Sequence, residues 1–153
     1  MSREPSLELS IVVPVFNEAG VLACTLSQIA AAMDGVTQNY EMVVVDDGST
    51  DSTWAILLEA NLADPRVRAI RLSRNFGKEA ALLAGLRHAT GRGVLVMDAD
   101  LQHPPHVIPA LYRAWKAGAE VVNGAKRRRD REPGGRRILS VLFHWAATNL
   151  TGL

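Results

Sequence analysis

Val94-Leu-Val-Met-Asp98-Ala-Asp100-Leu-Gln102 is an apolar run that ends abruptly in two carboxylates separated by one residue. Such a run predicts a buried parallel strand, and groups just past its carboxyl end would stand in the crevice where open α/β sheets bind ligands. Two carboxylates a few Å apart repel each other unless a proton or a cation lies between them. Oxygen ligands favour Mg²⁺ or Mn²⁺, which take phosphate oxygens as further partners. The segment therefore predicts a metal–diphosphate site, against the alternative of a solvated turn.

Polar groups also follow two earlier strands. Leu9-Ser-Ile-Val-Val-Pro-Val-Phe16 predicts a strand that leads into Asn17 and Glu18, and Glu41-Met-Val-Val-Val-Asp46-Asp47 predicts a second strand that ends in two acids. The carboxyl ends of parallel strands meet at one edge of a sheet, so these groups are expected to face one crevice. We expect Asp47 to accept a hydrogen bond from the base or ribose of a nucleotide. The alternative for the acidic pair is a helix cap plus a solvated turn acid.

Helices are expected between the strands. Apolar residues spaced by three or four predict a helix within residues 18–33, and Ser49 or Thr50 is expected to cap the helix after the second strand. Further strands are expected at 67–72 and 119–123, and further helices at 79–89 and after the prolines at 104–105. This alternation with short links predicts an α/β protein, a three-layer α/β/α sandwich with a mostly parallel sheet.

Composition narrows the class of protein. The chain has 153 residues, 48% hydrophobic and 22% charged, which suits one soluble globular domain. Cys24 is the only cysteine, which excludes an internal disulfide and a cysteine-based zinc site and favours a reducing compartment. The polar segment Met1–Glu8 argues against a signal peptide, and no apolar run approaches the ~20 residues that span a bilayer. His103 and His106 are three residues apart across two prolines, which disfavours zinc there. No glycine-rich dinucleotide or P-loop signature is present.

The charge is unevenly distributed. Lys126 to Arg137 holds seven basic and two acidic residues, a charge of +5, so the rest of the chain carries −4 to give the net +1. An acidic body with a basic segment suggests an anionic partner at that end. The Pro133-Gly134-Gly135 joint precedes residues 138–150, whose apolar side chains could form the face of an interfacial helix. Ordinary packing of that helix against the sheet is the alternative.

Four ordered motifs together resemble a known family. They are Pro14-Val-Phe-Asn17-Glu18, Asp46-Asp-Gly-Ser-Thr-Asp51, Asn75-Phe-Gly-Lys78 and Asp98-Ala-Asp-Leu-Gln-His-Pro-Pro105. They are similar to the signatures of inverting family 2 glycosyltransferases, in the branch of dolichyl-phosphate mannose synthase and bacterial polyisoprenyl-phosphate glycosyltransferases. The resemblance runs from residue 9 to about 150. It implies the GT-A (Rossmann-like) fold, a nucleotide-diphospho-sugar donor, Mg²⁺ or Mn²⁺, and a lipid-phosphate acceptor at the cytoplasmic face of a membrane, with no nucleic-acid partner.

The resemblance also assigns residues. It implies that Pro14, Phe16 and Glu18 line the nucleoside pocket and that Asp47 receives the base. It implies that Asp98, Asp100 and Gln102 hold the metal and the donor diphosphate, with Asp98 and Asp100 as the catalytic pair. Ala99 is implied to contact the nucleotide-sugar. The resemblance also implies that Lys126 helps to bind the nucleotide-sugar. Lys126 stands in Gly124-Ala-Lys126, where the family usually has Gly-x-Arg with an arginine that contacts phosphate, and lysine keeps the charge of arginine but lacks its two-pronged geometry. Relatives continue with further helices and often membrane spans, so the chain resembles a family member truncated at its carboxyl end.

These expectations divide the chain into three parts. Residues 1–8 are expected to be a flexible amino-terminal segment, residues 9–125 the nucleotide-sugar-binding domain, and residues 126–153 a basic loop with an amphipathic helix at the membrane surface. A bound metal would neutralise charge on the departing nucleoside diphosphate while the acceptor phosphate attacks the anomeric carbon. An acceptor that is already an anion needs no strong general base.

Three rival hypotheses are compatible with parts of this pattern. One is a transferase of the same fold with a hydroxyl acceptor, which would need a catalytic base. Another is a receiver-like signalling domain, since Asp46-Asp47, Asp98 and Lys126 loosely mimic its acid–acid–lysine set, although that fold places its acidic pair after the first strand. The third is a fragment that binds nucleotide-sugar without turnover.

Overall fold

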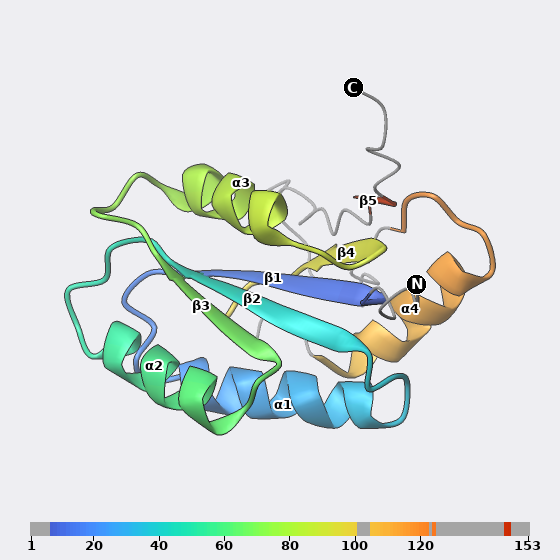
Figure 1. Cartoon of the computed structure of the whole chain (residues 1–153), viewed down its shortest axis with the longest axis horizontal. Helices are drawn as coiled ribbons and strands as arrows, with labels where there is room; N and C mark the ends of the chain where they lie inside the picture. Colours follow the sequence, from blue (N-terminus) through green and yellow to red (C-terminus); the bar gives the residue numbers. More distant parts are fainter. Residues whose placement is uncertain (1–6, 101–104, 123, 125–145, 148–153) are drawn as a thin grey trace, which may run out of the picture.

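A twisted, mostly parallel sheet forms the middle layer of the molecule (Figure 1). The computed structural model describes residues 7–100, 105–122, 124 and 146–147. The sheet has the order β3-β2-β1-β4-β5. Its parallel strands are β1 (Leu9–Val15), β2 (Tyr40–Asp46), β3 (Val67–Arg71) and β4 (Gly93–Val96). The edge strand β5 (Ala146–Ala147) pairs antiparallel with β4.

Helices cover both faces of the sheet. Figure 1 shows α1 (Leu22–Asp34), α2 (Thr53–Ala63) and α4 (Ile108–Lys116) along one face, with the short helix η1 (Pro105–Val107) preceding α4. Among the helices that the structure describes, only α3 (Lys78–His88) lies on the other face. This is the predicted three-layer α/β/α arrangement, and the mostly parallel sheet is confirmed.

Two cores follow from the alternation of side chains along buried strands. Ile11 and Val13 of β1 belong to the larger core, which also holds buried side chains of α1, α2 and α4. Val12 points the other way, into a smaller core with Ala81 of α3. Strands buried on both faces are continuous apolar runs, which is why the sequence reveals them so clearly.

Several sequence-based expectations about local structure are wrong. Neither Ser49 nor Thr50 caps α2, which begins at Thr53, and instead Asp51 Oδ1 accepts the backbone N–H of Thr53 at 2.9 Å. Residues 119–122 form no strand, although a short strand is expected from the sequence at 119–123. Residues 146–147 form a strand where a helix was expected over 138–150, and the rest of that helix lies outside the described residues. Within the described part of the chain, no helix has both the length and the apolar character needed to cross a membrane.

The register brings the strand ends together. Val15 of β1 pairs with Asp46 of β2, and Asp46 pairs with Arg71 of β3. The loops after these strands therefore leave the sheet at the same end, which is the left side of Figure 1. That end carries the polar motifs quoted above.

The opposite end of the sheet is tied to α4 through Glu8. Its carboxylate accepts hydrogen bonds from the Tyr112 hydroxyl at 2.6 Å and from Lys116 Nζ at 2.9 Å. The Tyr112 hydrogen bond, followed by that of Lys116, lowers the pKa of Glu8 from 4.5 to about 2. A carboxyl with a lowered pKa in the folded state stabilises the fold fully above its unfolded pKa and loses that contribution as the pH falls through the folded pKa.

We therefore predict that Glu8→Gln removes part of the acid sensitivity of the protein. The free energy of unfolding, measured with urea, should fall less between pH 5 and pH 2 in Glu8→Gln than in the wild type, because the window lies between the pKa of 4.5 and about 2. The exposed Glu120 offers a control of the same chemistry, Glu120→Gln. Identical pH profiles for the wild type and Glu8→Gln would contradict the prediction.

Candidate functional site

A cavity lies at the end of the sheet where the parallel strands finish. Its volume is about 260 Å³. Its walls come from the carboxyl ends of β1, β2 and β4, from the segment before α3, and from the first turn of α3. The lining residues are Pro14, Val15, Phe16, Glu18, Asp47, Asn75, Gly77, Lys78, Ala81, Asp98, Ala99 and Asp100.

The structure thus brings seven of the nine sequence-predicted site residues to one cavity. These are Pro14, Phe16, Glu18, Asp47, Asp98, Ala99 and Asp100. Gln102 and Lys126 lie outside the described residues. The cavity places these side chains where a ligand of the predicted kind would meet them, and their individual contacts with a ligand stay predictions.

The loop after β1 is fastened to the loop after β2. Asn17 has a positive φ of 54°, a conformation that asparagine tolerates better than most residues. Its side-chain oxygen accepts the backbone N–H of Thr50 at 2.9 Å, and its own N–H donates to Ser49 Oγ at 2.9 Å. The N–H of Glu18 donates to Thr53 Oγ1 at 2.8 Å. These bonds hold Phe16 and Glu18 at the rim of the cavity and leave Ser49 and Thr53 hydroxyls committed to the loop.

Asp46 faces away from the cavity. Its side chain is fully buried, and Oδ1 accepts the backbone N–H of Ser49 at 2.9 Å. Its second oxygen lies 3.2 Å from Arg71 Nε, and the Arg71 guanidinium also stacks over the Trp54 ring at 5.3 Å. Asp46 is therefore a structural acid, and of the acidic pair only Asp47 reaches the cavity.

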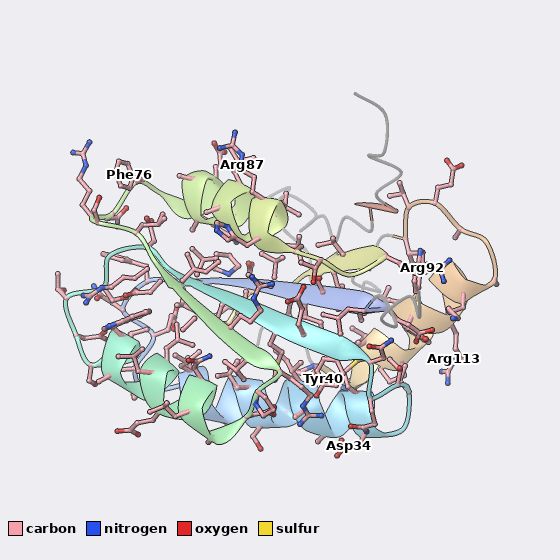
Figure 2. The ribbon with its side chains drawn as sticks, in the orientation of Figure 1. Asp34, Tyr40, Phe76, Arg87, Arg92 and Arg113 are labelled. Carbon is pink, nitrogen blue, oxygen red and sulfur yellow. The ribbon has the colours of Figure 1, made fainter. Side chains whose placement is uncertain are left out.

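Asp47 holds the loop that precedes α3. The side chain is buried, and its two oxygens accept the backbone N–H groups of Phe76 and Gly77, each at 2.8 Å. Figure 2 shows Phe76 on this outer turn. A carboxylate has about four acceptor positions, so two amide bonds leave capacity for a ligand donor. The predicted contact with a base or ribose is thus compatible with the structure, whereas the role of Asp47 in holding this loop is not indicated by the sequence.

Gly48 permits the close approach of the two loops. It has a φ of +69°, and a Cβ at this position would overlap the backbone carbonyl carbon of Arg74. A side chain here would therefore both strain the backbone and push the loop of Arg74 away from Asp47.

The Asp98-Ala-Asp100 segment is anchored on both sides. The backbone N–H of Met97 donates to the carbonyl of Val12 at 3.0 Å, and the Thr25 hydroxyl of α1 donates to the carbonyl of Ala99 at 2.8 Å. These bonds keep the segment in line with β4 after the regular strand ends at Val96. The two acidic side chains are thereby presented at the cavity from a fixed backbone.

Lys78 is the cavity residue whose role the sequence did not suggest. Its ammonium lies 2.7 Å from each oxygen of Asp98. The motif Asn75-Phe-Gly-Lys78 was recognisable, but only the fold brings the first residue of α3 to the end of β4. A usable signal was the lysine at the start of a helix, where the helix dipole disfavours a cation.

Negative charge accumulates on the side of the cavity near Glu18. Burial, and then the negative charges of Asp100 and Asp51, raise the pKa of Glu18 above 4.5. Within the described residues, no three Asp, Glu, His or Cys side chains are arranged to hold a metal ion by themselves. Mg²⁺ and Mn²⁺ are often held by one or two carboxylates, completing their shell with waters and substrate phosphates. The donor set of Asp98 and Asp100 fits that mode, and Asp98 already binds a cation, the ammonium of Lys78.

Comparison with known proteins gives the family. The model of "Glycosyl transferase family 2" matches residues 10–150. The chain belongs to glycosyl transferase family 2. The resemblance carried by the four sequence motifs is thereby confirmed, and so is the α/β fold of the GT-A type.

Individual relatives agree with this assignment. An uncharacterized glycosyltransferase of Bacillus subtilis, YkcC, is 40% identical over 153 residues, which are 100% of this chain and 47% of that protein. The undecaprenyl-phosphate 4-deoxy-4-formamido-L-arabinose transferase of Aeromonas hydrophila is 38% identical over 146 residues, 95% of this chain and 44% of that protein. The chain thus spans about half the length of the curated family 2 relatives that it matches.

A solved structure has a similar fold. The mannosyltransferase PcManGT from Pyrobaculum calidifontis, in complex with GDP-Man and Mn²⁺, aligns with a TM-score of 0.68 at 32% identity. The alignment covers 80% of this chain and 36% of that protein.

Proposed function

We propose that this chain is the donor-binding part of a polyisoprenyl-phosphate glycosyltransferase that uses Mg²⁺ or Mn²⁺ and inverts the transferred sugar. The observation that carries the proposal is the meeting of Asp47, Asp98 and Asp100 in one cavity at the strand ends. Support for the donor comes from PcManGT, whose structure holds GDP-Man and Mn²⁺. Support for the acceptor comes from the Aeromonas relative, which is named for undecaprenyl phosphate.

The chemistry assigns each group one task. Asp98 and Asp100, with Gln102, would hold the divalent cation, which when bound neutralises charge on the leaving nucleoside diphosphate. An oxygen of the acceptor phosphate forms the new bond to the anomeric carbon from the face opposite the donor phosphate. The bond from that carbon to the donor phosphate oxygen breaks, and the nucleoside diphosphate leaves with its electron pair. The attacking phosphate is already an anion, so Glu18 is not needed as a base.

Calorimetry with a panel of nucleotide-sugars tests this function. We expect at least one donor, such as a GDP- or UDP-sugar, to bind in the presence of Mn²⁺, and we expect a chelator to weaken that binding at least tenfold. The full 153-residue chain is used, since binding of the donor does not require the acceptor. Failure of every donor to bind, or binding that is indifferent to chelation, would contradict the proposal.

We also propose that the basic segment Lys126 to Arg137 binds the anionic surface of the cytoplasmic face of a membrane. Its charge of +5 follows from the sequence, and each basic residue near an anionic surface contributes about 1 kcal/mol. This segment lies outside the described residues, so the proposal rests on its charge alone.

We predict that the chain co-sediments with anionic liposomes and that salt reverses this binding, because the charge is screened. The double substitution Arg127→Glu and Arg128→Glu should lower the partition coefficient at least tenfold, since it changes the charge of the segment by four. Arg87→Glu with Arg113→Glu makes the same change of charge at two exposed arginines, labelled in Figure 2, that lie outside the segment. Equal losses in both double variants would show that only net charge matters and would contradict the proposal.

A further inference from the structure

The ion pair between Lys78 and Asp98 occupies the place that a metal would need. The Lys78 ammonium lies 2.7 Å from each oxygen of Asp98, so a metal ion that binds this carboxylate would compete with the ammonium. Asp98 is mostly enclosed, with 18% of its side chain exposed, whereas Lys78 is 61% exposed. The carboxylate is therefore fixed by the protein, and the ammonium is the partner that is free to move away.

We propose that Lys78 holds Asp98 as a stand-in cation while the site is empty, and that it transfers its charge to the donor diphosphate when a divalent metal takes its place. The inference rests on the proposed function, since it needs a metal and a diphosphate in the same cavity. Lys78 would thus have two successive anionic partners, first the carboxylate of Asp98 and then a phosphate of the donor.

The backbone around Lys78 favours a swing of the side chain over a movement of the loop. Asp47 fixes the amides of Phe76 and Gly77 at 2.8 Å each, directly before Lys78. Helix α3 begins at Lys78, and the Gly77 carbonyl accepts the N–H groups of Ala80 and Ala81 at 3.0 and 3.1 Å. The anchored backbone leaves the four-carbon stem, which is flexible in lysine, as the moving part. Lys78 already lines the cavity, so a diphosphate held there lies within reach of its ammonium.

The position of Lys78 is unfavourable for the helix itself. A cation in the first turn opposes the helix dipole, at a cost of about 0.3–1 kcal/mol. Residues that oppose a local preference such as this one are expected mainly at functional sites. The pairing of Lys78 with a carboxylate of the cavity therefore suggests that the lysine serves the site and not the helix. Lys78 forms its ion pair with Asp98, in the segment that follows β4, and not with a residue of α3. Packing within α3 therefore does not explain why a lysine stands at this position.

Exchange of partners makes metal and donor bind cooperatively. A metal that arrives alone must displace the ammonium and leave it without a partner, so its affinity is reduced. A metal that arrives with a diphosphate provides the ammonium with a new anion. The affinity of each ligand should therefore rise when the other is present, by the same factor.

The test compares Lys78→Met with Lys116→Met in the full chain. Lys116 also forms an ion pair with a carboxylate, 2.9 Å from Nζ to Glu8 Oε1, at the far end of the sheet. Binding of Mn²⁺ alone is followed by electron paramagnetic resonance, and binding of GDP and UDP in the presence of Mn²⁺ by calorimetry. We expect Lys78→Met to bind Mn²⁺ alone about two- to fivefold more tightly, since exposed ion pairs of this kind contribute up to about 1 kcal/mol. We expect it to bind the nucleoside diphosphate with Mn²⁺ at least tenfold more weakly, because a charge-assisted hydrogen bond is lost.

The remaining outcomes are decisive as well. Lys78→Arg keeps the charge and should stay within about threefold of the wild type in both measurements, and Lys116→Met should change neither. Equal Mn²⁺ affinity in the wild type and in Lys78→Met overturns the inference. The proposed function still stands in that case if nucleotide binding depends on the metal. Absence of Mn²⁺ binding in the wild type, with and without nucleotide, overturns both. If Lys78→Met fails to fold, as judged by circular dichroism, the wild type decides: Mn²⁺ affinity that does not rise with added nucleoside diphosphate overturns the inference.

Discussion

Replacing Asp100 by asparagine should weaken the Mn²⁺-dependent binding of a nucleoside diphosphate at least tenfold, or about 1.4 kcal/mol. Asp100 lines the cavity one residue beyond Ala99, whose carbonyl is held by the Thr25 hydroxyl. The backbone therefore cannot easily move to bring another oxygen into its place. Asparagine has the same size and keeps one oxygen, so the substitution removes the charge and little else. The site has two acidic ligands, so the loss of one carboxylate charge removes a large fraction of the electrostatic attraction for a divalent cation.

Asp34→Asn provides the matched control. It makes the same chemical change at an exposed carboxylate that Figure 2 shows at the other end of α1 from the cavity. Calorimetry with Mn²⁺ and with a chelator separates the metal-dependent part of the affinity from the rest. In Asp100→Asn the two conditions should become nearly equal, whereas in Asp34→Asn the difference should match the wild type. Metal-dependent affinity that survives in Asp100→Asn would remove Asp100 from the metal site.

The sequence predicts the strands well because buried parallel strands are apolar on both faces. Runs such as Leu9–Val15 and Tyr40–Asp46 stand out for that reason, and their ends locate the cavity. The strand expected at 119–123 is not formed, since residues 119–122 have no strand conformation. Strand pairing depends on the neighbouring strands of the whole sheet, so it cannot be predicted from a five-residue segment.

The candidate site was predictable where side chains follow strands and unpredictable where loops meet. Asp47 and Asp98 could be placed at the cavity from the pattern alone. Their partners could not, because Gly77 and Lys78 reach them across 30 and 20 positions of sequence. Likewise Ser49 was expected at a helix start, but its hydroxyl accepts the N–H of Asn17 from another loop. Such contacts depend on tertiary structure that local propensity does not encode.

Replacing Asp47 by alanine should lower both the stability of the protein and its affinity for nucleosides. The amide of Phe76 loses its acceptor and the amide of Gly77 keeps only Asn75 Oδ1, at 3.0 Å, so the free energy of unfolding should fall by about 1 kcal/mol. If Asp47 also accepts a bond from the base or ribose, a nucleoside monophosphate should bind at least tenfold more weakly even when a chelator removes all metal. Urea unfolding measures the first effect, and calorimetry under chelation measures the second.

Gly48→Ala separates direct recognition by Asp47 from its effect on the loop. The added Cβ would meet the backbone of Arg74, so the loop is pushed away while the Asp47 carboxylate remains. Stability should fall in Gly48→Ala as it does in Asp47→Ala, since both disturb the same junction. Binding of a nucleoside monophosphate under chelation should fall much further in Asp47→Ala, because only that variant lacks the carboxylate. Equal losses of binding in the two variants would mean that Asp47 acts on the nucleotide only by holding the loop that carries Lys78.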